Sequence, residues 1–91
     1  MKTRMLITVT GHVQGVCYRY FTGQQAQTLG VTGWVRNLPN GTVEGCFEGE
    51  ENAVTSLVEW CGRGPEEARV DQVTVVRHDY LGEFQGFLIT G

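Results

Sequence analysis

The residues that could do chemistry are concentrated in one glycine-rich stretch, Gly11 to Arg19, which reads GHVQGVCYR. Gly11 and Gly15 permit a tight turn, and Arg19 stands where a helix is predicted to begin. A loop of this kind directs several backbone N–H groups at one point, and a helix N-terminus adds its dipole. An arginine at that end opposes the dipole, and a bound anion would offset the cost. The stretch therefore predicts a phosphate or carboxylate site with Arg19 as its fixed positive charge.

Other interpretations of the same stretch are weaker but remain open. The glycine spacing matches neither the dinucleotide-binding fingerprint nor the P-loop, so an ordinary strand-to-helix connection is the plain alternative. Cys17 could be a nucleophile in such a loop. Only one residue separates it from Arg19, however, and the loop of cysteine phosphatases needs a wider spacing. His12 has no Ser or Asp partner at triad spacing and is expected to be solvated.

A second polar group, Asn37, stands at the end of a predicted strand, just before the turn Leu38-Pro39-Asn40-Gly41. A carboxamide cannot act as a base, but it can hold a water molecule by hydrogen bonds. The alternative is an ordinary turn residue, a place where asparagine is common.

The elements that must position these groups follow from apolar periodicity. Alternating patterns predict strands at 5–10, 31–37, 42–48, 70–79 and 84–90, and helical spacing predicts helices at 18–29 and 51–61. This order is typical of the ferredoxin-like split β-α-β-β-α-β fold, of class α+β, with a short C-terminal strand added. We expect two helices on one face of an antiparallel sheet, within a single domain over residues 1–91.

Composition excludes several classes of partner. The net charge is −3, and Lys2 and six scattered arginines form no basic stripe, so nucleic acid is not expected as a partner. No apolar run is long enough for a membrane span or a signal peptide, and we expect a cytoplasmic protein. Cys17, Cys46 and Cys61 form no CxxC pair, so no metal or redox site is predicted. In a reducing compartment all would be thiols, and Cys46 and Cys61 are expected to be buried.

Taken together, these motifs strongly resemble the acylphosphatase family, and the match extends over essentially the whole chain. The second predicted helix is matched mainly by its hydrophobic pattern. The residues that carry the resemblance are Gly11-x-Val13-Gln14-Gly15-Val16-x-Tyr18-Arg19, Leu29-Gly30, Gly33-Trp34-Val35-Arg36-Asn37, Asn40-Gly41-x-Val43-Glu44, Trp60 and Gly64-Pro65.

The resemblance implies hydrolysis of the carboxyl–phosphate anhydride of small acyl phosphates, without metal or cofactor. It implies that Arg19 binds the phosphate and that Asn37 positions the attacking water. It also implies that inorganic phosphate or a similar anion binds the same loop. The cradle would be formed by the backbone N–H groups of Gln14, Gly15, Val16, Cys17, Tyr18 and Arg19.

Cys17 departs from the family pattern, which usually has glycine or a larger apolar residue there. A thiol at this position predicts oxidative inactivation or an oligomer linked through Cys17, since the odd number of cysteines leaves one unpaired. Two other functions stay open for the same fold. One is a binding or regulatory module without turnover. The other is an RNA-binding domain, which the acidic charge and the lack of paired aromatic residues on the third strand disfavour.

Overall fold

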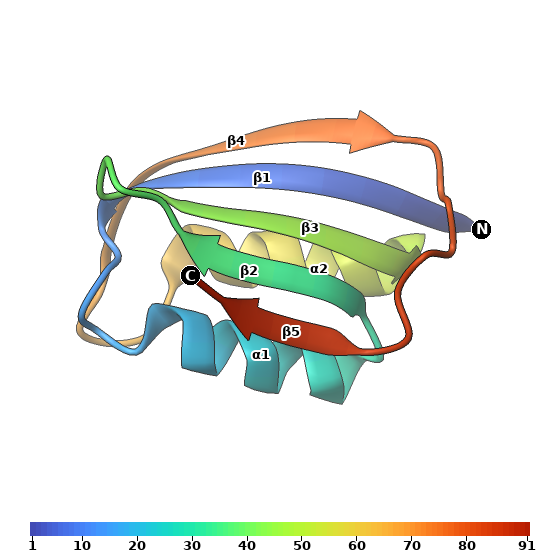
Figure 1. The fold of residues 1–91 in the computed structure, drawn as a ribbon, viewed down its shortest axis with the longest axis horizontal. Coiled ribbons are helices and arrows are strands. Elements are labelled where there is room, and N and C mark those ends of the chain that lie inside the picture. The colour runs from blue at the N-terminus through green and yellow to red at the C-terminus, as the bar shows by residue number, and fades with distance from the viewer.

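The computed structural model describes all of residues 1–91 as a layer of five strands against a layer of two helices (Figure 1). Both helices cover the same face of the sheet, and the other face is open. This confirms the predicted split β-α-β-β-α-β arrangement with a short last strand. The elements are β1 (Lys2–His12), α1 (Tyr18–Leu29), β2 (Thr32–Asn37), β3 (Val43–Glu50), α2 (Glu51–Arg63), β4 (Arg69–His78) and β5 (Phe87–Thr90).

The sheet has the order β4-β1-β3-β2-β5 and is mixed rather than wholly antiparallel. β1 pairs antiparallel with β3 and β4, and β2 pairs antiparallel with β3, but β5 lies parallel to β2. The reason is the path of the chain after β4. The connection crosses the end of the sheet at which β2 begins, so β5 enters the far edge running in the same direction as β2 (Figure 1).

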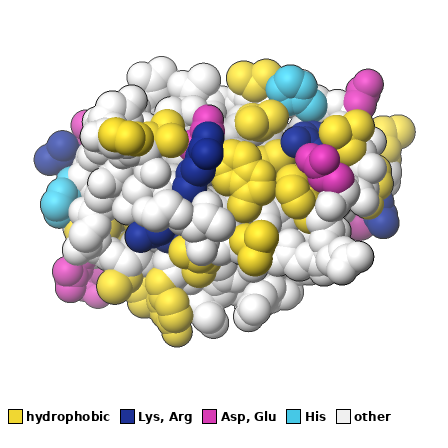
Figure 2. Space-filling view, in the orientation of Figure 1, with side chains coloured by type: hydrophobic (Ala, Val, Ile, Leu, Met, Phe, Trp, Pro, Cys, Tyr) yellow, Lys and Arg dark blue, Asp and Glu magenta, His cyan; other side chains and the backbone are white.

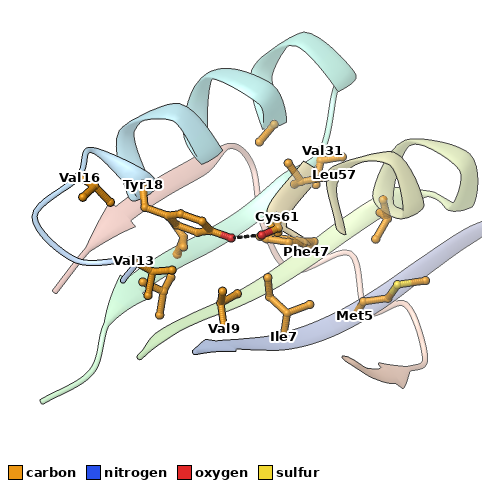
Figure 3. Close-up of a cluster of buried hydrophobic side chains, with 14 residues drawn as sticks. Met5, Ile7, Val9, Val13, Val16, Tyr18, Val31, Phe47, Leu57 and Cys61 are labelled. Carbon is orange, nitrogen blue, oxygen red and sulfur yellow. Dashed lines mark hydrogen bonds between the residues drawn. The ribbon is translucent and has the colours of Figure 1, made fainter. Parts of the chain in front are cut away.

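The core lies between the sheet and the helices. Alternate residues of β1, Met5, Ile7 and Val9, point toward the helices and are buried, as the strand pattern predicts. From α2, Leu57 and Cys61 meet them with no exposed side-chain surface (Figure 3). Burying side chains of this size is the main stabilising contribution to a small domain.

The first helix has a thin apolar face, and a glycine brings it close to the last strand. A methyl group at Gly23 would lie only 2.9 Å from Ile89 Cδ1, so the glycine allows β5 to pack directly on α1. The edge strand is thereby fixed against the helix that follows the glycine-rich loop.

The open face carries one apolar row that crosses every strand of the sheet. Cross-strand pairing aligns its members, and apolar side chains are clustered in the centre of this face in Figure 2. The row consists of Val76, Leu6, Cys46, Trp34 and Leu88. Cys46 is fully buried in it, as predicted, while Leu88 at the edge remains 63% exposed.

A buried carboxylate holds the β4–β5 connection in place. Glu48 is fully buried and accepts hydrogen bonds from the backbone N–H groups of Leu81, Gly82 and Glu83 at 2.8, 3.3 and 3.2 Å. The Arg4 guanidinium adds a contact of 3.3 Å. Burial by itself raises the pKa of Glu48, but these hydrogen bonds outweigh it, so the pKa is lowered from its ordinary value. An ionised Glu48 therefore fixes the path that places β5 beside β2.

Candidate active site

The loop between β1 and α1 is anchored by its own apolar side chains. Val13 and Val16 are 1% and 8% exposed, and both lie in the core beside Tyr18 (Figure 3). The Tyr18 hydroxyl donates a hydrogen bond of 2.6 Å to the Cys61 carbonyl on α2. Burial raises the pKa of the Tyr18 phenol, so it remains a neutral donor. With these side chains held in the core, the loop backbone is fixed at the protein surface.

Two residues of the loop adopt the left-handed conformation. Gly15 has φ 77°, and Cys17, which caps the N-terminus of α1, has φ 60°. Cys17 is the only non-glycine residue of the chain with positive φ, a conformation that costs roughly 1–2 kcal/mol with a side chain. Left-handed residues of this kind turn successive N–H groups toward one side, which makes a concave anion-binding backbone.

The side chain of Gln14 ties this loop to the turn between β2 and β3. Its Nε2 donates hydrogen bonds of 2.9 Å to the carbonyls of both Leu38 and Thr42. Asn37, the last residue of β2, directly precedes this turn and is therefore held next to the loop. These side-chain hydrogen bonds connect residues that lie far apart in sequence. They were not expected, because the family resemblance implied a role only for the backbone N–H of Gln14.

Arg19 lies in the first turn of α1 and is held by the end of the last strand. Its Nη1 donates a hydrogen bond of 2.6 Å to the carbonyl of Thr90. Because β5 pairs parallel to β2, with Thr90 opposite Arg36, this carbonyl lies near the end of β2. The loop, the end of β2 and the end of β5 lie at the same end of the molecule (left in Figure 1).

These groups line one pocket with a volume of about 410 Å³. It brings Arg19 and Asn37 together with the predicted loop residues, except for Val16, which is nearly buried and does not line this pocket. Asn37 Oδ1 is buried and has no hydrogen-bond partner in the protein. The lining residues are Val13, Gln14, Gly15, Cys17, Tyr18, Arg19, Tyr20, Asn37 and Ile89. The arrangement therefore brings the loop backbone and the Arg19 guanidinium, which are donors, close to the carboxamide of Asn37.

The three cysteines differ in access. Cys17 is exposed on the loop, whereas Cys46 and Cys61 are buried free thiols, as predicted. Burial raises the pKa of both buried thiols, in Cys61 to about 12. His12 is exposed at the end of β1, in agreement with the expectation of a solvated side chain.

Sequence reasoning missed the contacts that connect the elements of this pocket. The Gln14 amide, the Tyr18 hydroxyl and the Thr90 carbonyl each act across a long distance in sequence. Gln14 gave one usable signal, because a glutamine inside a glycine loop has both donor and acceptor atoms to satisfy. The role of the Thr90 carbonyl gave no signal in the sequence, since every residue has a backbone carbonyl.

Two features of the whole chain complete the description. No cluster of three or more His, Cys, Asp and Glu side chains has an arrangement that could hold a metal ion. Neither helix combines the length and apolar character that crossing a membrane requires.

Comparison with known proteins gives one consistent result. A model of the acylphosphatase family matches residues 5–89. An acylphosphatase of Geobacter sulfurreducens is 59% identical over 87 residues, which cover 96% of each chain. The crystal structure of acylphosphatase from Bacillus subtilis superposes with a TM-score of 0.92 at 37% identity, covering 98% of each chain. An acylphosphatase structure from Coxiella burnetii gives 0.91 at 35% identity, covering 97% of this chain and 92% of that one. The chain therefore belongs to the acylphosphatase family of hydrolases.

Proposed function

We propose that the chain hydrolyses the carboxyl–phosphate anhydride bond of small acyl phosphates by in-line attack of a water molecule on phosphorus, with no covalent intermediate. Arg19 and the backbone N–H groups of residues 14–19 hold the phosphoryl group, and Asn37 positions the water. Residues 1–91 act as a single domain in this proposal. The three free cysteines fit the predicted cytoplasmic location, because thiols persist in a reducing compartment.

The observation that carries the proposal is the unpaired oxygen of Asn37. A buried amide oxygen without a donor costs roughly 1–3 kcal/mol, and Asn37 Oδ1 is such an oxygen, on a residue that lines the same pocket as Arg19. A water that donates to this oxygen would recover the cost. The same hydrogen bond would orient a lone pair of the water toward a phosphoryl group in the loop.

The loop supplies the electrostatic part of the reaction. Negative charge on the equatorial phosphoryl oxygens meets fixed N–H donors and the Arg19 guanidinium, which Thr90 already holds in place. Donors that are preorganised in this way need no rearrangement as charge develops, which is the largest catalytic contribution in many enzymes. Phosphoryl transfer depends mainly on such positioning and charge stabilisation.

The leaving group explains why no strong acid is needed. A carboxylate is a stable anion, so the departing oxygen requires no proton. No side chain in the pocket is an obvious base, and we infer that the substrate phosphate accepts the proton of the attacking water. The rate should then follow ionisation of the substrate across pH rather than titration of a protein group.

The direct test compares acetyl phosphate with p-nitrophenyl phosphate in the presence of a metal chelator. Hydrolysis of the acyl phosphate alone is expected. Arg19→Ala and Asn37→Ala should each lower kcat/KM about a hundredfold or more. Arg36→Ala on the open face and Asn52→Ala on α2 are matched controls outside the pocket and should retain full activity. Wild-type rates in either pocket variant would reject the proposed roles.

A second experiment tests the absence of a covalent intermediate. An acyl thiophosphate that is chiral at phosphorus through 16O and 18O, hydrolysed in water labelled with 17O, should give thiophosphate of inverted configuration, because one in-line displacement inverts phosphorus. Retention would require two displacements and therefore a phosphorylated enzyme.

Cys17 carries the remaining proposal about partners. Of the three thiols only Cys17 is exposed, so it alone could form a disulfide with a second chain. Because Cys17 lines the pocket, such a dimer should be inactive until it is reduced.

A further inference from the structure

A second cavity adjoins the phosphate pocket, and the proposed mechanism does not use it. This cavity, here called the side pocket, has a volume of about 400 Å³ and lies between the loop, α1 and the end of α2. It shares Gly15 and Cys17 with the phosphate pocket, so the rim of the loop is common to both. Its lining residues are Gly15, Val16, Cys17, Phe21, Gln25, Trp60, Pro65, Glu66 and Glu67.

The walls of the side pocket are aromatic and partly preformed. The Trp60 ring packs against the buried Tyr18 ring at a centroid distance of 5.7 Å, which limits its movement. Phe21 is 43% exposed, a high value for a phenylalanine. Rigid aromatic surfaces of this type bind flat apolar groups at low entropic cost.

The side pocket is also acidic, in contrast to the loop beside it. Glu66 and Glu67 are exposed in its lining, which contains no Lys, Arg or His. The basic residues that flank these glutamates in sequence, Arg63 in the last turn of α2 and Arg69 at the start of β4, are not part of the lining. One side of the shared rim therefore attracts anions, and the other side repels them.

We infer that the side pocket receives the acyl group of the substrate and selects neutral aromatic or cationic acyl groups against those with a second negative charge. The inference rests on the proposed function. In an acyl phosphate the carbonyl carbon is joined to phosphorus through a single bridging oxygen. A phosphoryl group in the loop therefore leaves the acyl group at the rim formed by Gly15 and Cys17, where the side pocket opens.

The two parts of the selection have different physical origins. Contact with Phe21 and Trp60 stabilises the substrate and the transition state alike, so it lowers KM with little effect on kcat. Glu66 and Glu67 act by charge. In water, like charges about 8 Å apart weaken binding roughly two- to threefold each, and salt screens the effect.

The first test uses acyl phosphates that differ in charge at the same ring position. Benzoyl phosphate, 4-(aminomethyl)benzoyl phosphate and 4-carboxybenzoyl phosphate are compared with acetyl phosphate, which is too small to fill the side pocket. The expected order of kcat/KM is cationic, then neutral, then anionic. The double variant Glu66→Gln/Glu67→Gln should narrow the ratio between the neutral and the anionic substrate by about sixfold at low ionic strength. A Glu59→Gln/Asp79→Asn double variant makes the same charge change on exposed sites outside the pocket and should leave the ratio unchanged.

The aromatic wall is tested separately. Phe21→Ala should raise KM for benzoyl phosphate roughly fivefold relative to acetyl phosphate, as expected for partial loss of an aromatic contact. Leu88→Ala removes an exposed apolar side chain from the opposite face and should change KM for neither benzoyl phosphate nor acetyl phosphate. An equal change of KM for every substrate in Phe21→Ala, acetyl phosphate included, would overturn the inference. A ratio of kcat/KM between neutral and anionic substrates that is the same in wild type and in the glutamate double variant would also overturn it.

A binding measurement separates failure of the inference from failure of the proposed function. The corresponding benzylphosphonates are not hydrolysed, and each should slow alkylation of Cys17 in the same order of charge. Absence of acetyl phosphate hydrolysis would reject the proposed function. Equal protection of Cys17 from alkylation by the three phosphonates would reject the side pocket as an acyl site, whether or not acetyl phosphate is hydrolysed.

Discussion

The link between the loop and the β2–β3 turn gives the sharpest prediction. Gln14 Nε2 is the only side-chain donor to the Leu38 and Thr42 carbonyls, at 2.9 Å in both cases. Gln14→Met keeps the length and most of the volume of the side chain but removes the donors. We expect the variant to lose both stability and turnover, since the link also holds Asn37 beside the loop.

The size of the stability loss depends on the hydrogen bonds that the two carbonyls still accept in the variant. The Leu38 carbonyl also accepts the Gly41 N–H at 3.1 Å, and the Thr42 carbonyl accepts the Leu38 N–H at 2.9 Å. Neither is left unpaired in the variant, so the cost is that of two net hydrogen bonds at about 1 kcal/mol each. The free energy of unfolding should fall by about 2 kcal/mol. For a domain of this size, that corresponds to a Tm lower by roughly 8–16 °C.

Urea unfolding and steady-state kinetics test both parts. The urea concentration at the midpoint of unfolding should be lower in Gln14→Met than in the wild type, with the m-value unchanged. With acetyl phosphate, kcat should fall by as much as about a hundredfold, because a displacement near 1 Å of a positioning group has that effect. Gln27→Met makes the same chemical change on the exposed face of α1 and serves as the control. A loss below about 0.5 kcal/mol, or a wild-type kcat in the destabilised variant, would refute the reasoning.

Three further predictions concern conformational strain, pH and thiol access. Cys17→Gly should raise the stability by up to about 1 kcal/mol relative to Cys17→Ala, because only glycine adopts φ 60° without strain; equal unfolding midpoints would contradict this. The lowered pKa of Glu48 gives stability that is present above its ordinary value of 4.5 and is lost as pH falls below it. Glu48→Gln should therefore be less stable by about 3 kcal/mol near pH 7. Its stability should also depend less on pH below 4.5 in chemical denaturation, and parallel curves would exclude the assignment. A thiol reagent should label only Cys17 in the native protein and also Cys46 and Cys61 after unfolding, as read by mass spectrometry. A disulfide-linked dimer formed with an added oxidant should be absent in Cys17→Ser, and its persistence there would contradict the proposed linkage.

Local sequence determined the elements and the identity of the loop. The alternation of Met5, Ile7 and Val9 predicted β1, and the spacing of Leu57 and Cys61 predicted the buried face of α2; both are confirmed. Such patterns are readable because the period of a strand or a helix is a property of a few neighbouring residues. The family was identified from the joint pattern of short motifs along the chain, and the loop, whose backbone donors need glycines at fixed short spacing, is one of them.

The tertiary structure decided how these pieces meet. The parallel pairing of β5 depends on a connection whose path is set by the buried Glu48 of β3, far from β5 in sequence. That pairing places the Thr90 carbonyl against Arg19, and the Gln14 side chain joins the loop to the end of β2. The burial of Asn37 Oδ1 and the side pocket behind the shared rim depend on the same packing. Contacts of this kind are set by the packing of distant segments, and no local pattern encodes them. The sequence by itself therefore named the groups of the proposed site, and the fold set their geometry.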